Sequence, residues 1–238
     1  MRRRPLILFL ALLSVFLWSL PSARAASRWA PSSEKDARQK ALDLFCECAF
    51  HAEYLPYTLP QYLNRWEQEI TIWLGGNPTK KDREALDAFL RELQENVPGL
   101  PAMRRVREDY KAKIRIWYVP EYSMFWYIPG YVTGNYGFFS YETDASCRIV
   151  SARIGLATDA ADQKERIHLM KEELVGALGL PGDHETYRDS ILYDPWTEVQ
   201  NLSDVDWRML RYLYSSWVFP GMSEKEARTA LLAHPDPL

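Results

Sequence analysis

The chain has 238 residues and a formal net charge of −3, with 32 acidic residues against 29 lysines and arginines. It carries no stripe of basic residues alternating with aromatic ones, so composition and charge argue against a nucleic-acid-binding protein. No linker rich in serine or glycine divides the chain, and its length suffices for one sizeable core.

Residues 1–25 are typical of a secretory signal peptide. Arginines at positions 2–4 precede an apolar stretch over residues 6–20, and the small-residue pattern Ala23-Arg24-Ala25 follows. Because this stretch is shorter than the roughly 20 residues of a spanning helix, we expect cleavage after Ala25 rather than a membrane anchor. Cleavage removes four arginines and no acidic residue, which changes the net charge to −7. We therefore expect a secreted or extracytoplasmic protein with one domain over residues 26–238 and no transmembrane segment.

The first predicted helix begins at Ser33, with Asp36 three residues later as in a capping box. Apolar residues at helical spacing place Cys48 on its buried face and Cys46 off that face. The chain has three cysteines, an odd number, in a compartment that permits disulfides. If a disulfide forms, we expect it to join Cys48 to Cys147.

A second helix is predicted after Thr79 and Asp82, which form a capping signal, and it ends at Pro98-Gly99. Segments in which apolar residues alternate predict strands on either side of it. These predicted strands cover residues 64–74, 114–118 and 149–156.

Residues 117–141 hold eleven aromatic residues in 25 positions. An exposed shelf of aromatic rings would suit sugars or peptides. The interpretation that we favour is that these rings fill the core and cover sheet edges.

The longest amphipathic helix is predicted over residues 163–179, starting at Asp159 or Asp162, and two short helices follow after Ser203 and Ser223. The expected fold class is α+β, with helices packed on a small mixed sheet and a mostly irregular C-terminal part that contains short helices. We expect Ile167, Leu174 and Leu178 to be buried, and Glu172 to face the opening of a cleft.

His168 and Glu172 lie one turn apart on this helix, so their side chains converge above one patch. Metal-binding helices use this spacing, and so do ordinary surface pairs of histidine and glutamate. The spacing alone does not separate the two.

The segment from Glu172 to Gly182 resembles the metzincin zinc helix, H-E-x-x-H-x-x-G-x-x-H, without gaps. The resemblance places the general base on Glu173 and the helix-breaking glycine on Gly179. The three zinc histidines are missing, because Glu172, Gly176 and Gly182 stand at their positions. Further along, residues 189–193 resemble the Met-turn region with Leu192 in place of the methionine.

The chain also resembles the bacterial family called domain of unknown function 2927, a metzincin-like group of exported proteins. Three features carry this resemblance: Glu172-Glu173, the turn over residues 178–183, and Leu213-Tyr214 followed by Pro220-Gly221-Met222-Ser223-Glu224. The resemblance implies a metzincin-like fold whose cleft includes Gly176, Gly179 and Tyr193.

Three functions follow as hypotheses. In the first, the zinc motif is degenerate, and the domain binds a peptide or cell-envelope polymer in the former active-site cleft without a cofactor. The second is a metal-dependent, peptidase-like hydrolase in which His168, Glu172 and either Asp183 or His184 hold zinc, and Glu173 acts as general base. The third is a glycan-binding or glycan-active protein that uses Glu172 and Glu173 with the aromatic segment.

Overall fold

The computed structural model describes residues 27–52 and 61–237. Its helices are α1 (Glu34–Phe50), α2 (Lys80–Asn96), α3 (Gln163–Gly179), α4 (Asp204–Leu213) and α5 (Glu224–Ala233). Its strands are β1 (Ile70–Gly76), β2 (Met103–Arg105), β3 (Ile114–Val119), β4 (Gly137–Thr143) and β5 (Ile149–Ala157). Two 3-10 helices, η1 (Asp109–Lys111) and η2 (Glu121–Trp126), flank β3.

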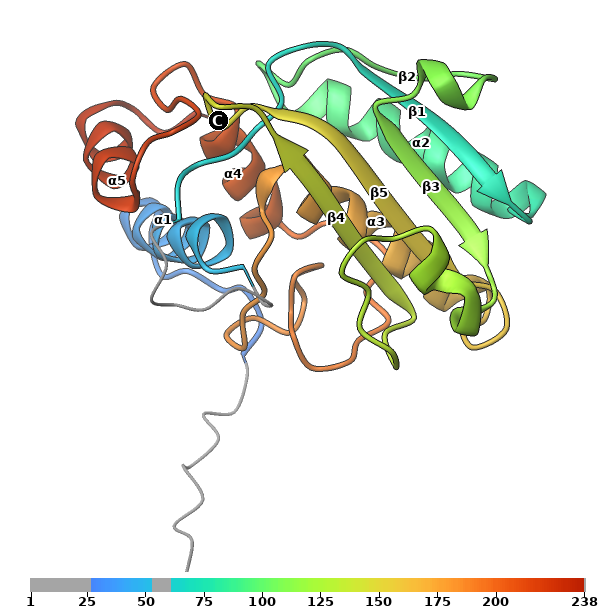
Figure 1. Ribbon diagram of the computed structural model, residues 1–238. Coiled ribbons are helices and arrows are strands. Elements are labelled where there is room, and N and C mark those ends of the chain that lie inside the picture. Colours follow the sequence, from blue (N-terminus) through green and yellow to red (C-terminus); the bar gives the residue numbers. More distant parts are fainter. Residues whose placement is uncertain (1–26, 53–60, 238) are drawn as a thin grey trace, which may run out of the picture.

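The strands form one mixed sheet in the order β2-β1-β3-β5-β4. All neighbours are parallel except β4, which runs antiparallel to β5 at one edge. Helices α2 and α3 cover one face of the sheet, and α1, α4 and α5 group beside its β4 end (Figure 1). The predicted α+β class is confirmed, and the sheet is mostly parallel.

The main core lies between the sheet and the helices α2 and α3. Strand residues such as Ile72, Ile114 and Ile116 are fully buried there, together with Leu86 of α2 and Leu174 of α3. A smaller cluster on the opposite face joins η2 to β3 and β4 through residues Val119, Met124, Ile128, Phe138 and Ala157.

Local capping signals set the helix starts. Capping boxes begin α2 at Thr79, α4 at Ser203 and α5 at Ser223, as predicted. A capping box also begins α3 at Asp162, one of the two starts that the sequence left open. For α1, the Ser33 side chain accepts a hydrogen bond from the Asp36 N–H. Each cap satisfies amide groups that the first helical turn leaves without an intrahelical partner, so the short sequence signal is sufficient.

Two strands were not predicted, β2 and β4. The strand predicted over residues 64–74 begins only at Ile70 and continues through Gly76. Strand β2 has three residues, all partly or fully exposed, and β4 lies in the aromatic segment without a clear alternation of polar and apolar residues. The expected burial of Ile167 is wrong, since this side chain is half-buried and its neighbour Arg166 is buried instead.

The prediction that Cys46 lies off the buried face of α1 is wrong. Cys46 is buried like Cys48, because both sides of α1 are covered, by α4 and by α5. All three cysteines are free thiols. Burial raises the pKa of Cys46 to about 12 and that of Cys48 well above its ordinary value, so both remain protonated.

The aromatic segment divides into two groups. Tyr118 and Phe138 are buried, which agrees with the core interpretation, whereas Tyr122, Phe125 and Trp126 are exposed on or beside η2. Within the described residues, no helix is both long enough and apolar enough to cross a membrane.

Candidate functional site

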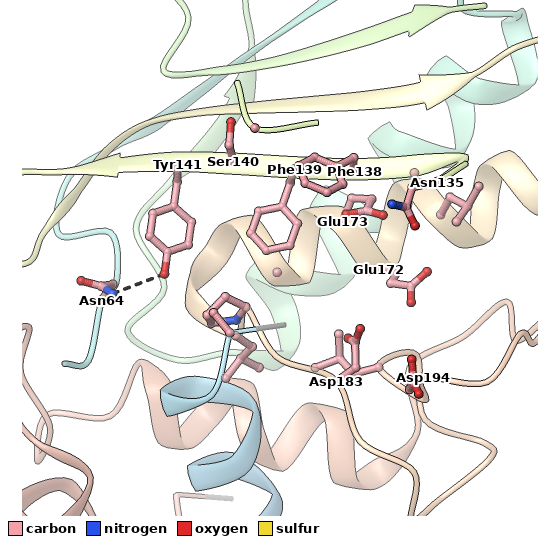
Figure 2. A pocket seen from close by; sticks show the side chains of 18 of the residues that line it. Asn64, Asn135, Phe138, Phe139, Ser140, Tyr141, Glu172, Glu173, Asp183 and Asp194 are labelled. Carbon is pink, nitrogen blue, oxygen red and sulfur yellow. Dashed lines mark hydrogen bonds between the residues drawn. The ribbon is translucent and has the colours of Figure 1, made fainter. Parts of the chain in front are cut away.

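A cavity of about 940 Å³ lies between β4, α3 and the segment over residues 180–197. We call this cavity the cleft. Strand β4 runs along one side and α3 lies next to it, while the segment after α3 forms the opposite wall (Figure 2). His168, Glu172, Glu173, Gly176 and Tyr193 line the cleft, as expected from the sequence.

His168 and Glu172 form a pair on α3. The imidazole Nε2 of His168 lies 3.4 Å from Oε2 of Glu172, and Nδ1 donates to the carbonyl of Val199 at 2.6 Å. Burial lowers the pKa of His168, but the hydrogen bond and negative charge of Glu172 raise it, and the net pKa is above the ordinary value. The pair holds the Glu172 carboxylate at the cleft.

Glu173 lies beneath β4. A Cβ atom added to Gly137 would collide with Oε1 of Glu173, so this glycine makes room for the carboxylate. Glu173 itself is almost fully buried. The residue predicted as a general base is therefore packed against the backbone of β4 at the edge of the cleft.

Gly176 and Gly182, which stand where the metzincin motif has histidines, are closely packed. A Cβ atom on Gly176 would collide with the ring of Phe139, and one on Gly182 would collide with the carbonyl oxygen of His51. Neighbouring segments therefore occupy the space that ligand side chains would need at these positions. A zinc site of the metzincin type does not fit this arrangement.

The opposite wall of the cleft is a pair of short extended segments joined by main-chain hydrogen bonds. The His184 N–H donates to the Leu192 carbonyl at 3.0 Å, and the Asp194 N–H donates to the His184 carbonyl at 3.0 Å. This pairing places Asp183 and Asp194 on the same wall of the cleft, and both line it.

His184, one of the two alternatives for the third metal ligand, does not line the cleft, whereas the other, Asp183, does. Adjacent residues of an extended segment point to opposite sides, so Asp183 faces the cleft while His184 turns into the protein. Its Nδ1 accepts a hydrogen bond from the Thr186 N–H at 3.1 Å. Burial lowers the pKa of His184 to about 4, so its ring is neutral at pH 7.

Gly179, also predicted for the cleft, ends α3 instead of lining the cavity. Its φ of +123° is a conformation that favours glycine, and a Cβ atom there would collide with the carbonyl oxygen of Asn64. Across residues 27–52 and 61–237, no three side chains of His, Cys, Asp or Glu are grouped so that they could hold a metal ion.

Strand β4 lies at the edge of the sheet, and no strand among the described residues pairs with its outer side, which borders the cleft. The Ala157 N–H donates to the Tyr136 carbonyl at 2.8 Å, which makes these two residues a hydrogen-bonded pair. Such pairs alternate along an antiparallel ladder, so Gly137, Phe139 and Tyr141 direct their main-chain N–H and C=O groups away from β5.

Several cleft residues were not predicted. The side-chain amide of Asn64 donates to the Tyr141 hydroxyl at 3.3 Å and fixes that ring beside the cleft. Asn135 and Asp194 line the cleft as well (Figure 2). No sequence signal identified these residues, because they reach the cleft through the pairing of distant segments.

The comparisons with known proteins bear on the same region. A model of the family described as protein of unknown function, DUF2927, matches residues 38–233. The chain belongs to this family. Every residue that lines the cleft lies within the DUF2927 match. A comparison with the curated proteins finds no match.

Proposed function

We propose that this DUF2927 protein is exported and binds an extended peptide, or the peptide part of a cell-envelope polymer, in the cleft. The observation that supports this proposal is the edge strand β4, whose outward main-chain groups at Gly137, Phe139 and Tyr141 run along a cavity of about 940 Å³. An extended peptide matches such an edge because its own N–H and C=O groups repeat with the same spacing.

The side chains of β4 support the same proposal. Phe139 and Tyr141 point from the strand towards α3, whereas Ser140 points to the other face (Figure 2). A peptide strand added to β4 would direct every second side chain towards α3, between these rings and the wall that carries Asp183. The cavity therefore offers both main-chain pairing and room for side chains.

The glycan hypothesis has weaker support. It relies on exposed aromatic rings close to Glu172 and Glu173, but the most exposed rings of the aromatic segment, on Tyr122, Phe125 and Trp126, do not line the cleft. The rings that do line it include Phe139 and Tyr141 of the edge strand β4, which favours a peptide ligand.

Binding to the β4 edge can be tested with three acetylated and amidated octapeptides, which are repeats of Thr-Lys, Thr-Gln and Thr-Glu. We expect at least one of them to slow hydrogen exchange at the amides of Gly137, Phe139 and Tyr141 by about tenfold or more. A factor of this order corresponds to the net free energy of one added main-chain hydrogen bond. If none of the three changes exchange in β4, the proposal is rejected.

N-methylated peptides provide the matched control. Two versions of each peptide are compared, one methylated at the odd-numbered amides and one at the even-numbered amides. Methylation should weaken binding by about tenfold in one version and little in the other, because only one set of amides faces β4. Equal losses of affinity in the two versions would mean that the peptide does not pair with β4 as a strand.

A second candidate function is metal-dependent hydrolysis. It is favoured by the His168 ring, whose Nδ1 is held by the Val199 carbonyl while Nε2 faces Glu172, since metal-binding histidines are commonly oriented by such a carbonyl. Metal analysis of the purified protein separates the two functions. Stoichiometric zinc that is lost in both His168→Ala and Glu172→Ala would establish the second, and zinc that is absent, or kept by both variants, would reject it.

A further inference from the structure

Carboxylates predominate among the charged side chains that line the cleft, where His168 is the titratable group of the opposite sign. Four carboxylates line it, on Glu172, Glu173, Asp183 and Asp194, and none of the described residues that line it is a lysine or an arginine. Carboxylates that share a confined space repel one another, because water screens them less there than at an open surface.

Three of these carboxylates come from different parts of the chain and face a common space. Glu172 reaches it from α3, while Asp183 and Asp194 reach it from the opposite wall (Figure 2). His168 also lines the cleft and lies 3.4 Å from Glu172 on α3, whereas Asp183 and Asp194 belong to the opposite wall.

Aromatic rings also line the cleft. Phe139 and Tyr141 of β4, Tyr193 and Trp196 all contribute to its lining. The faces of such rings attract cations, and this attraction adds to that of nearby carboxylates when the cation is partly removed from water. The lining thus combines the two groups that recognise an ammonium or guanidinium ion.

We infer that the cleft selects peptides with a lysine or arginine side chain at the positions that point towards α3. This inference rests on the proposed peptide binding and names the ligand class. In a strand paired with β4, alternate side chains point towards α3, and a cationic group beside Phe139 would lie between Glu172 of α3 and the carboxylates of Asp183 and Asp194 on the opposite wall. An acidic side chain at the same place would be repelled by these carboxylates.

The same three octapeptides test the inference when their dissociation constants are measured by titration at low ionic strength. The Thr-Lys peptide should bind at least about tenfold more tightly than the Thr-Gln peptide, and the Thr-Glu peptide most weakly, because only the side-chain charge differs. Raising the salt concentration should reduce the preference for lysine, since screening weakens the attraction.

Variants locate the selectivity in the cleft. The double substitution Glu172→Gln and Asp194→Asn should reduce the Thr-Lys to Thr-Gln preference to about threefold or less. Glu198→Gln is the control, because Glu198 lies near Asp194 in sequence but outside the cleft lining, where it pairs with Lys164. It should leave the preference unchanged.

The outcomes separate the inference from the proposed function. Equal binding of the Thr-Lys and Thr-Gln peptides, with β4 amides protected by both, would overturn the charge selectivity and leave peptide binding in place. A lysine preference that survives the double substitution would also overturn it. Failure of all three peptides to bind would overturn the proposed function itself.

Discussion

Close contacts at single glycines shape the cleft. Gly137 leaves room for the Glu173 carboxylate, and Gly176 for the Phe139 ring. These contacts bring α3 directly against β4, which places Glu172 at the cleft edge of the strand. A histidine at position 176 would have to displace the Phe139 ring, so this position is compatible with the packing of β4 on α3 only when its residue is small.

Gly179→Ala tests the glycine that ends α3. We expect it to lower the free energy of unfolding by about 2 to 4 kcal/mol, from the unfavourable φ together with the collision of the new Cβ with the Asn64 carbonyl. Gly130→Ala is the matched control, because Gly130 also has positive φ (+77°) but no atom within 4 Å of its Cβ position. It should cost about 1 kcal/mol. Equal losses in urea denaturation would show that the Asn64 contact contributes nothing.

His184→Asn tests the buried histidine of the cleft wall. The folded-state pKa of His184 is about 4 and its ordinary value is 6.5, so between these pH values only the unfolded chain binds the proton. The free energy of unfolding should therefore fall by up to about 3 kcal/mol as the pH decreases from 6.5 to 4. The asparagine can still accept from the Thr186 N–H and does not titrate.

Urea denaturation at several pH values measures this difference. The stability of the wild type relative to His184→Asn should decline steadily between pH 6.5 and 4. Parallel pH profiles of the two proteins would contradict the buried, neutral state of His184.

At the level of elements, the cleft wall is attached to α4 through one buried carboxylate. Asp206 accepts hydrogen bonds from the Ser203 N–H at 2.7 Å and the Ile191 N–H at 3.1 Å, and also from the hydroxyls of Ser190 and Ser203. Its role as a helix cap was predicted. The connection to residues 190 and 191 was not, because a capping signal shows only contacts within the helix start.

Asp206→Ala should lower the free energy of unfolding by about 3 kcal/mol or more, since it leaves the buried Ile191 amide and Ser190 hydroxyl without their acceptor. Glu226→Ala is the matched control, as Glu226 has the same position in the capping box of α5 but is exposed, and its carboxylate accepts hydrogen bonds from Ser223 alone among the described residues. It should cost about 1 kcal/mol. Similar losses for the two variants in thermal unfolding would contradict the connecting role of Asp206.

Across the whole molecule, features that depend on residues close together in the sequence could be predicted, and features that depend on distant segments could not. Helix starts at Thr79 and Ser223 depend on residues three positions apart and were correct. Strand β4 depends on pairing with β5 and on packing against α3, so its sequence carried no sufficient pattern. The same holds for the cleft, where Glu172 and Asp183 were predicted from one helix and its following turn, but Asn64 and Asp194 were not.

The predicted signal peptide gives a test at the N-terminus. The chain is attached to the cleft wall from Ser27 onwards, because the Ser27 N–H donates to the Thr186 carbonyl at 3.1 Å and the Trp29 N–H to Asp189 Oδ1 at 2.9 Å. Cleavage after Ala25 would keep both contacts, whereas cleavage beyond Trp29 would remove them.

We therefore expect the exported protein to begin at Ala26, as measured by intact mass and N-terminal sequencing of protein from the extracytoplasmic fraction of the producing cells. Its charge of −7 follows from the four arginines removed. Ala23→Phe together with Ala25→Phe should block processing, because the signal peptidase accepts small residues at these positions. Uncleaved wild-type protein that remains inside the cell would reject the prediction of export, and a mature N-terminus beyond Trp29 would show that the contacts with Thr186 and Asp189 are dispensable.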